Sequence, residues 1–357
     1  MPVATPTSPL EAPVIARSRA RRGLLRGGRG RLLGLVVALA GLAGATLASI
    51  LIGNYSISID DVFAAISRPP ETDLDRIVRH IRIPRTVAGL LAGTALGIAG
   101  AVMQGITRNP LAGPGILGIN SGAALAVVLA MTVFGVSTAS GYVWFAFAGA
   151  AAAAVFVYSL GSLGLGGATP VKLALAGAAF TAFVGAITSA ITLFDATTLD
   201  DFRFWVVGSL TRADSTALLS VAPFIAAGIF AAILTSRTLN VLALGDDMAR
   251  NLGTRLWSAR LAAALSVVLL AGSATAIAGP IGFIGLVVPH IARLITGPDY
   301  RWIMAWTLVL APTLLLIADI LGRILVTPQQ LQVGIITGLA GAPFFLYLVR
   351  NRKVSGL

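Results

Sequence analysis

The residues with the most distinctive chemistry in this sequence are three arginines. Arg79, Arg82 and Arg85 recur at every third position of the stretch VRHIRIPRT, directly before a long apolar run. A guanidinium is always charged and donates up to about five hydrogen bonds in a fixed fork, so each of these side chains needs acceptors. What those acceptors are depends on the elements that carry the arginines and on the side of a membrane where they lie.

Catalytic and metal-binding constellations are missing from the sequence. The chain has no cysteine, which excludes disulfides, thiolate metal sites and cysteine nucleophiles. His290, which follows Pro289, is interpreted as a packed or interfacial residue rather than a ligand. No aspartate pair has a third carboxylate or histidine at ligand spacing, so we predict no metal site and no cofactor. The pairs interpreted instead as loop ends or helix caps are Asp60 and Asp61, Asp200 and Asp201, and Asp246 and Asp247.

The sequence also lacks a site for ATP. The pattern G-x-x-x-x-G-K-[ST] does not occur, and the only lysines are Lys172 and Lys353. All acidic residues except Asp319 fall in loops or at the ends of apolar runs, whereas an intramembrane enzyme or a proton-coupled carrier needs ionisable groups within the membrane. We therefore predict that the chain is not an enzyme and that any uphill transport draws its energy from another protein.

Membrane-spanning helices must position these residues. Of the 357 residues, 57% are hydrophobic and only 11% are charged, with a mean hydropathy of +0.90, whereas soluble domains carry about 25% charged residues. Apolar runs of roughly 20 residues can each cross about 30 Å of hydrocarbon as a helix, and they are apolar on all sides, which excludes a barrel. We predict an all-α polytopic membrane protein with ten spans, at residues 32–52, 86–105, 116–134, 142–161, 170–194, 215–235, 257–278, 281–296, 302–325 and 333–349.

The basic residues predict the orientation. Much of the formal charge of +12 lies before the first span, so the positive-inside rule puts the N-terminus in the cytoplasm and, with ten spans, the C-terminus as well. Residues 1–31 are interpreted as a disordered basic tail that contacts anionic lipid, and not as a twin-arginine export signal, because the apolar run after it is too long. Residues 32–353 then form the membrane domain, and 354–357 a cytoplasmic end. This orientation leaves in one outer loop Arg68, Arg76, Arg79, Arg82 and Arg85.

Two segments of the sequence repeat each other. LLAGTALGIAG (Leu90 to Gly100) and LLAGSATAIAG (Leu269 to Gly279) match at eight of eleven positions. They lie in the second and seventh predicted spans. Because these spans are five apart, an odd number, the two segments cross the membrane in opposite directions. Inverted repeats are typical of transporters with a path at the repeat interface.

A short cytoplasmic segment has the pattern of a docking helix. In LGDDMARNLG, Asp246 is a candidate N-cap and Gly253 a stop, while Leu244, Met248 and Leu252 form one apolar stripe at four-residue spacing. Such a helix can lie in a groove of a partner protein or on the membrane surface, and the pattern alone favours neither.

Several of these segments resemble a known family. RIPRTVAGLLAGTALGIAGAVMQGITRNPLAGPGILGINSGA (Arg82 to Ala123), LGDDMARNLG, GPIGFIGLVVPHIARLITGPDYR (Gly279 to Arg301), ADILGRIL and LQVGIITGLAGAPFFLYLV (Leu331 to Val349) are similar to FecCD-type permease subunits of ABC importers for iron-siderophores, haem and vitamin B12. The resemblance covers roughly residues 32–353, in order. It implies a bacterial inner-membrane protein that pairs with a second permease chain, identical or related, binds two ATPase subunits and receives cargo from an extracytoplasmic binding protein.

The resemblance also implies roles for individual residues. Arg82, Arg85 and Arg323 match positions that meet acidic residues of the binding protein. For Arg323, an ion pair with Asp319 four residues earlier is an alternative or an addition, and Arg76 and Arg79 are interpreted as solvated or facing lipid headgroups. The stretch similar to the family's coupling helix, which contacts the ATPase, contains Gly245, Asp246, Asp247, Met248, Ala249, Arg250, Leu252 and Gly253.

Uncharged polar residues near the repeat interface are candidates for the path, because they can wet a passage without gripping cargo. Each of them can instead bond between helices, and Asn109 before Pro110, in an Asn-Pro-Leu motif of the family, can equally form a turn. The candidates are Gln104, Asn109, Asn120, Ser121, Thr181, Ser189 and Thr192. The predicted function is permeation of a ferric siderophore or similar metal chelate, with an ion-gradient-driven secondary transporter as the alternative.

Overall fold

The computed structural model describes residues 23–351 except 26, 56, 71, 137, 165–168 and 213. Most of the predicted basic tail and the C-terminal end therefore lie outside the described residues. Within them every regular element is a helix, which confirms the all-α class. Each predicted span corresponds to one helix: α1 (Gly27–Leu51), α4 (Ile83–Thr107), α5 (Ile119–Phe134), α6 (Ala139–Ser162), α7 (Pro170–Phe194), α9 (Ser215–Leu242), α11 (Leu256–Ala278), α12 (Ile284–Thr296), α13 (Tyr300–Ile324) and α14 (Val333–Asn351).

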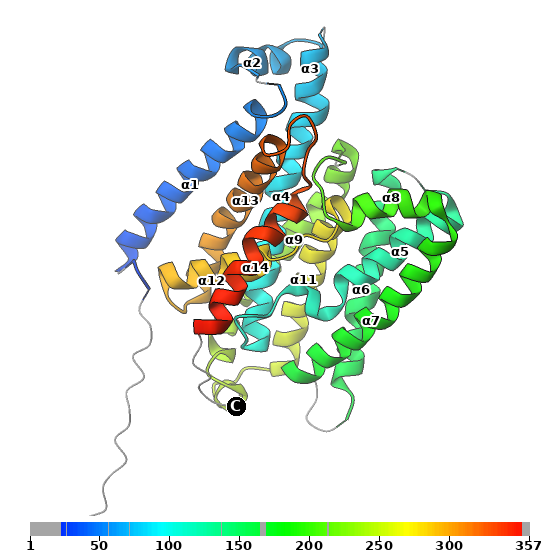
Figure 1. Ribbon diagram of the computed structural model, residues 1–357. Coiled ribbons are helices and arrows are strands. Elements are labelled where there is room, and N and C mark those ends of the chain that lie inside the picture. Colours follow the sequence, from blue (N-terminus) through cyan, green and yellow to red (C-terminus); the bar gives the residue numbers. More distant parts are fainter. Residues whose placement is uncertain are drawn as a thin grey trace, which may run out of the picture.

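Seven of these helices, or longer helical stretches containing them, have the length and apolarity to cross a membrane, and α5, α12 and α14 are shorter apolar helices. The described chain also contains α2 (Ile59–Ser67), α3 (Asp73–Ile77), α8 (Ala196–Val206), α10 (Asp246–Asn251) and a 3-10 turn, η2 (Pro114–Leu117). Figure 1 shows α5 to α8 gathered on one side of the molecule, while α1 lies along α13 on the opposite side.

The helices α4 and α11 form the centre of the molecule. They pack against each other, and α4 also packs against α9, α12 and α13. Close approach depends on small residues: a Cβ atom at Gly100 would lie 1.8 Å from the carbonyl oxygen of Gly285 in α12, and one at Gly93 would lie 2.6 Å from Cα of Pro312 in α13. Small side chains let helix backbones meet at such distances, which is how helices associate in a membrane.

The two central helices carry the repeated sequences, and they run antiparallel. The C-terminal end of α4 and the N-terminal end of α11 meet at the same place, beside α10, where Arg108 and Arg260 both contact Asp246. This opposite direction is the arrangement that the five-span offset of the repeat predicts. We refer to this end of the molecule as the α10 end and to the opposite one as the α2 end.

The segment predicted as an outer loop is helical over much of its length. Residues Asp73–Thr107 form one helical stretch, in which the π-helix η1 (Val78–Arg82) joins α3 to α4. Pro84 has no backbone N–H, and a local change to π geometry accommodates such a gap in the hydrogen-bond ladder. Before it, Ser58 and Asp61 form a capping box at the start of α2, and the hydrogen bonds from Ser58 lower the pKa of Asp61.

The start of the first span also differs from the prediction. α1 begins at Gly27, so Arg29 and Arg31, which the sequence assigned to a disordered tail, lie in its first turns. Arg31 stacks over the ring of Trp302 in α13, with its guanidinium carbon 5.7 Å from the ring centroid. The aromatic contact, together with backbone hydrogen bonds from Leu24 and Leu25 to the carbonyls of Leu294 and Ile295, holds this glycine-rich start of the helix against its neighbours.

Candidate functional site

The arginines of VRHIRIPRT each bind a different element at the α2 end. Arg79 donates to backbone carbonyls at the end of α2, those of Ala65, Ile66 and Arg68. Arg82 donates to the carbonyl of Ile52, just after α1, and to that of Tyr55 at 3.0 Å. The last carbonyls of a helix have no partner within the helix, and cations are favourable there.

Arg85 reaches across to α13. Its Nε lies 3.1 and 3.0 Å from the two carboxylate oxygens of Asp319, its Nη2 lies 2.8 Å from Oδ1, and its Nη1 donates to Oε1 of Gln330 at 2.6 Å. Asp319 also accepts from Nε of Arg323 at 3.0 Å, one turn later in the same helix. The prediction of an Asp319–Arg323 pair is confirmed.

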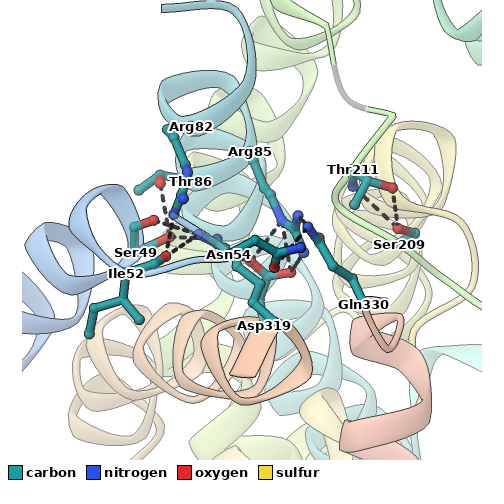
Figure 2. A network of polar contacts seen from close by, with 11 residues as sticks. Ser49, Ile52, Asn54, Arg82, Arg85, Thr86, Ser209, Thr211, Asp319 and Gln330 are labelled. Atoms are coloured by element: carbon teal, nitrogen blue, oxygen red, sulfur yellow. Dashed lines mark hydrogen bonds and ion pairs between the residues drawn. The ribbon is translucent and has the colours of Figure 1, made fainter. Parts of the chain in front are cut away.

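Arg323 completes the connection to α1. Its Nη1 donates to the carbonyls of Ser49 at 2.6 Å and Ile52 at 3.0 Å, and its Nη2 donates to Oγ of Ser49 at 3.0 Å. Figure 2 shows Ser49, Arg82, Arg85 and Asp319 converging between the ends of α1, α4 and α13. We call the group of Arg82, Arg85, Asp319 and Arg323 the Asp319 network.

The Asp319 network is buried, which differs from the exposure expected of docking residues. The exposed fractions of Arg82, Arg85 and Arg323 are 6%, 5% and 2%. The sequence offered Asp319 as a partner for Arg323, but it gave no sign that Arg85 shares this carboxylate or that Gln330 and backbone carbonyls are acceptors, because these contacts join segments far apart in the chain. Arg79, interpreted from the sequence as solvated or facing lipid headgroups, is half-buried and has backbone acceptors at the end of α2 that the sequence did not indicate. Arg76 is exposed, as predicted, and pairs with Asp73.

At the other end, α10 occupies the predicted segment. Gly245 is its N-cap with φ 106°, and Asp246 is the first helical residue, not the N-cap as predicted. A positive φ suits glycine, which explains why the cap falls one residue earlier. Leu252 ends the helix, and Gly253, with φ 79°, follows as the predicted stop.

The predicted apolar stripe of this segment is on the surface. Leu244, Met248 and Leu252 are 65%, 51% and 60% exposed, whereas Ala249 is buried. Arg250 bonds to Asp247 at 3.2 Å in an exposed pair. The segment therefore presents apolar side chains outward and rests on the membrane domain through its opposite face.

Asp246 points the other way, toward the membrane helices. Its Oδ2 lies 2.8 Å from Nη2 of Arg260 in α11, and its Oδ1 lies 3.3 Å from Nη2 of Arg108, the residue that ends α4. The side chain of Asp246 is 29% exposed and that of Arg260 19%. We call these three residues the Asp246 cluster.

The path candidates fall into two groups. Four of them, Gln104, Asn109, Asn120 and Thr192, bond within the chain. Gln104 donates to the carbonyl of Leu286 at 3.2 Å and accepts from Arg293, Asn120 accepts from Thr275 at 3.2 Å, and Thr192 donates to the carbonyl of Thr188 at 3.0 Å.

Asn109 serves a turn, because its Oδ1 accepts the backbone N–H of Leu111 at 2.9 Å. Ser121 is half-buried in α5, and Thr181 and Ser189 are exposed on α7. Thr181 and Ser189 are eight residues apart and lie on one face of that helix.

The chain matches a family model, that of the FecCD transport family, over residues 41–351. It belongs to this family. Among FecCD relatives, the ferric enterobactin transport system permease protein FepD of Escherichia coli (strain K12) is 46% identical over 313 residues, which cover 87% of this chain and 93% of that protein. The hemin transport system permease protein HmuU of Yersinia pestis is 39% identical over 279 residues, covering 77% of this chain and 83% of that protein.

A solved structure supports the same placement. A metal-chelate type ABC transporter in an inward-facing conformation has a chain that matches with a TM-score of 0.77 and 27% sequence identity, covering 90% of this chain and 99% of that one. This FecCD chain is thus similar in sequence and in fold to permeases of ABC importers across nearly its whole described length.

Proposed function

We propose that this FecCD chain is the membrane-spanning permease subunit of an ABC importer for a ferric siderophore or a similar metal chelate. Its relatives include permeases named for ferric enterobactin and hemin, and they match over most of their length. A separate ATPase, in two copies, would supply the energy, because the sequence has no nucleotide-binding loop of its own. The α10 end would face the cytoplasm, with both termini on that side and the α2 end outside.

The exposed stripe of Leu244, Met248 and Leu252 is the observation that carries this proposal. It lies on the short helix α10 and the residues that flank it, next to the charged groups that mark a water-facing end. An amphipathic helix with anchors at four-residue spacing fits a groove in a partner protein. A helix lying on the membrane would present the same stripe to lipid, and binding of the ATPase decides between the two.

The α2 end supports docking of a binding protein. The Asp319 network has three guanidinium groups and one carboxylate, Asp319, so positive charge is in excess there. Acidic residues of a binding protein would complement this charge, which steers encounter and fixes orientation more than it adds affinity. Direct pairing would require Arg82, Arg85 or Arg323 to leave internal acceptors. Arg82 is best suited, because its acceptors named above are all backbone carbonyls.

The cargo path would lie between two permease chains. The repeat helices α4 and α11 pack directly on each other within the chain, so the central interface is filled. Helix α7 presents Thr181 and Ser189 on its exposed surface, where small polar groups could face a passage. A second copy or a related permease would close that passage from the other side.

Reconstitution of the transporter tests the proposal. The chain, the ATPase and the binding protein are placed in liposomes, and import of iron-55 as ferric enterobactin is measured with and without ATP. ATP-dependent import, or stimulation of the ATPase by loaded binding protein, is expected. An iron gradient formed by the chain alone, dissipated by an uncoupler while ATP is held constant, would instead establish the secondary transporter.

Substitutions in the stripe test the ATPase contact. Burying one such apolar side chain stabilises a complex by about 1.5–3 kcal/mol, so Met248→Asp should weaken ATPase binding by roughly tenfold or more. Leu325→Asp, which changes an exposed apolar residue at the α2 end, is the matched control and should leave ATPase binding intact. Equal ATPase binding by both variants would contradict the assignment of α10.

A further inference from the structure

The Asp246 cluster joins three elements that the proposed function uses. Asp246 belongs to α10, Arg108 ends α4 and Arg260 lies in the second turn of α11. The neighbouring Asp247 shows the contrast, because its side chain is 97% exposed and pairs only within α10, with Arg250. Of the two aspartates, Asp246 is the one that ties the helix to the membrane domain.

The backbone at Arg108 adds a second observation. This residue adopts a left-handed conformation with φ 51° as the C-cap of α4. Glycine is the usual residue there, and another residue pays about 1–2 kcal/mol for the conformation. A glycine at this position would have no side chain to reach Asp246. Arginine is strained in this backbone conformation, but its side chain makes the contact with Asp246 at 3.3 Å.

The two helices held by Asp246 reach deep into the molecule. They pack on each other, and α4 continues without a break toward the α2 end, where Arg82 and Arg85 belong to the Asp319 network. A force applied to α10 therefore has a continuous, tightly packed route to the other end of the chain. Close packing transmits displacement because interiors are nearly incompressible.

We propose that Asp246 is a positioning residue, which fastens α10 to the ends of α4 and α11 so that both central helices follow when the ATPase moves α10. This inference rests on the proposed function, since it assumes that α10 is the contact with the ATPase. Partly exposed ion pairs are each worth less than about 1 kcal/mol, so the cluster contributes more to the position of α10 than to stability. The side chain of Asp246 points away from the exposed stripe, so its positioning role is distinct from contact with the ATPase.

The test measures whether α11 follows α10. The chain has no cysteine, so spin labels can be introduced at Ser258→Cys near the start of α11 and at Leu325→Cys at the end of α13 without removing native thiols. The distance between the labels is measured by pulsed electron resonance in the purified complex with the ATPase, before and after trapping with ATP and vanadate. When the Asp246 cluster is unsubstituted, we expect the distance between the two labels to change on trapping.

Two substitutions should abolish this shift while the ATPase is still bound. They are Asp246→Asn and Arg260→Gln, which remove one charge each from the shorter ion pair. Arg260→Lys should restore the shift, because it keeps the charge, and a role in packing alone would not predict this rescue. Arg301→Gln is the matched control: it removes an ion pair of 2.9 Å with Asp299, the N-cap of α13, which is not part of the Asp246 cluster, and it should keep the full shift.

The outcomes are distinguishable. A full shift in both Asp246→Asn and Arg260→Gln, or an equal loss in Arg301→Gln, overturns the inference. If Asp246→Asn does not yield folded complex, the comparison of Arg260→Gln with Arg260→Lys still decides. Failure of the unsubstituted chain to bind the ATPase would overturn the proposed function itself, and that result is seen at the purification step.

Discussion

At the scale of single residues, the arginine spacing has a structural explanation. Successive turns of one helix present Arg79, Arg82 and Arg85 to the end of α2, the end of α1 and the side of α13. Each guanidinium supplies donors to carbonyls at helix ends or to the carboxylate of Asp319, and Arg323 shares two of these acceptors, the carbonyl of Ile52 and Asp319. Their first role is therefore to hold separate elements around α4.

The carboxylate of Asp319 should be the most sensitive residue of this network. Asp319→Asn leaves Arg85 and Arg323 buried with no counter-charge, and breaking a buried ion pair costs about 3–5 kcal/mol. We expect a clearly lower unfolding temperature in detergent. Asp200→Asn is the control, because it breaks a pair with Arg203 in which both side chains are about two-thirds exposed, and such pairs contribute less than about 1 kcal/mol. An equal fall in the two variants would contradict this account.

The sequence predicts which charged residues are important better than it predicts the residues to which they bind. Asp319 and Arg323 are four apart in one helix, so their pair follows from local spacing. Arg85 and Asp319 are far apart in the chain and meet only because α4 packs against α13. For the same reason the shared role of Arg108 and Arg260 at Asp246 was not predicted, although the helix that contains Asp246 was.

At the scale of elements, local pattern determined most of the fold. All ten apolar runs are helices because each is long and apolar on every side. The misplaced part, residues 73–82, contains no long apolar run, and its local helix signal is the short capping box of Thr72 and Asp75, which the prediction from sequence did not use. Arg79 and Arg82 then bind α2 and α1, and these tertiary contacts cannot be predicted from local sequence.

Glycine at the crossing of α4 and α12 provides a prediction at this scale. Gly100→Ala would put a methyl group 1.8 Å from the carbonyl oxygen of Gly285, so the two helices must separate. Overpacking of this kind costs about 1–3 kcal/mol, and we expect a lower unfolding temperature. Gly44→Ala in α1, where no atom lies within 4 Å of the added methyl group, should not lower it, because alanine is the better helix former. The same fall in both variants would refute the close crossing.

At the scale of the whole molecule, one helical stretch connects the two candidate contact surfaces. Asp73–Thr107 runs from the α2 end, with the Asp319 network, to the α10 end, where Arg108 meets Asp246. The antiparallel partner α11 starts where α4 ends. The proposed importer would thus connect binding protein and ATPase through a single buried helix pair, which a sequence repeat suggests but cannot position.

Arg82→Gln tests the outer contact of this arrangement. The substitution removes a charge that no carboxylate neutralises directly, since Arg82 donates to the carbonyls of Ile52 and Tyr55. In the reconstituted complex, the binding-protein concentration that half-saturates ATPase stimulation should rise about fivefold, equivalent to ~1 kcal/mol, with the maximal rate restored at saturation. Arg203→Gln, which removes an exposed charge of α8 that is already paired, is the control and should not shift the curve. A fall in maximal rate at unchanged half-saturation would assign Arg82 to the fold of α1 and α4 alone, and docking would then have to use other residues of the α2 end.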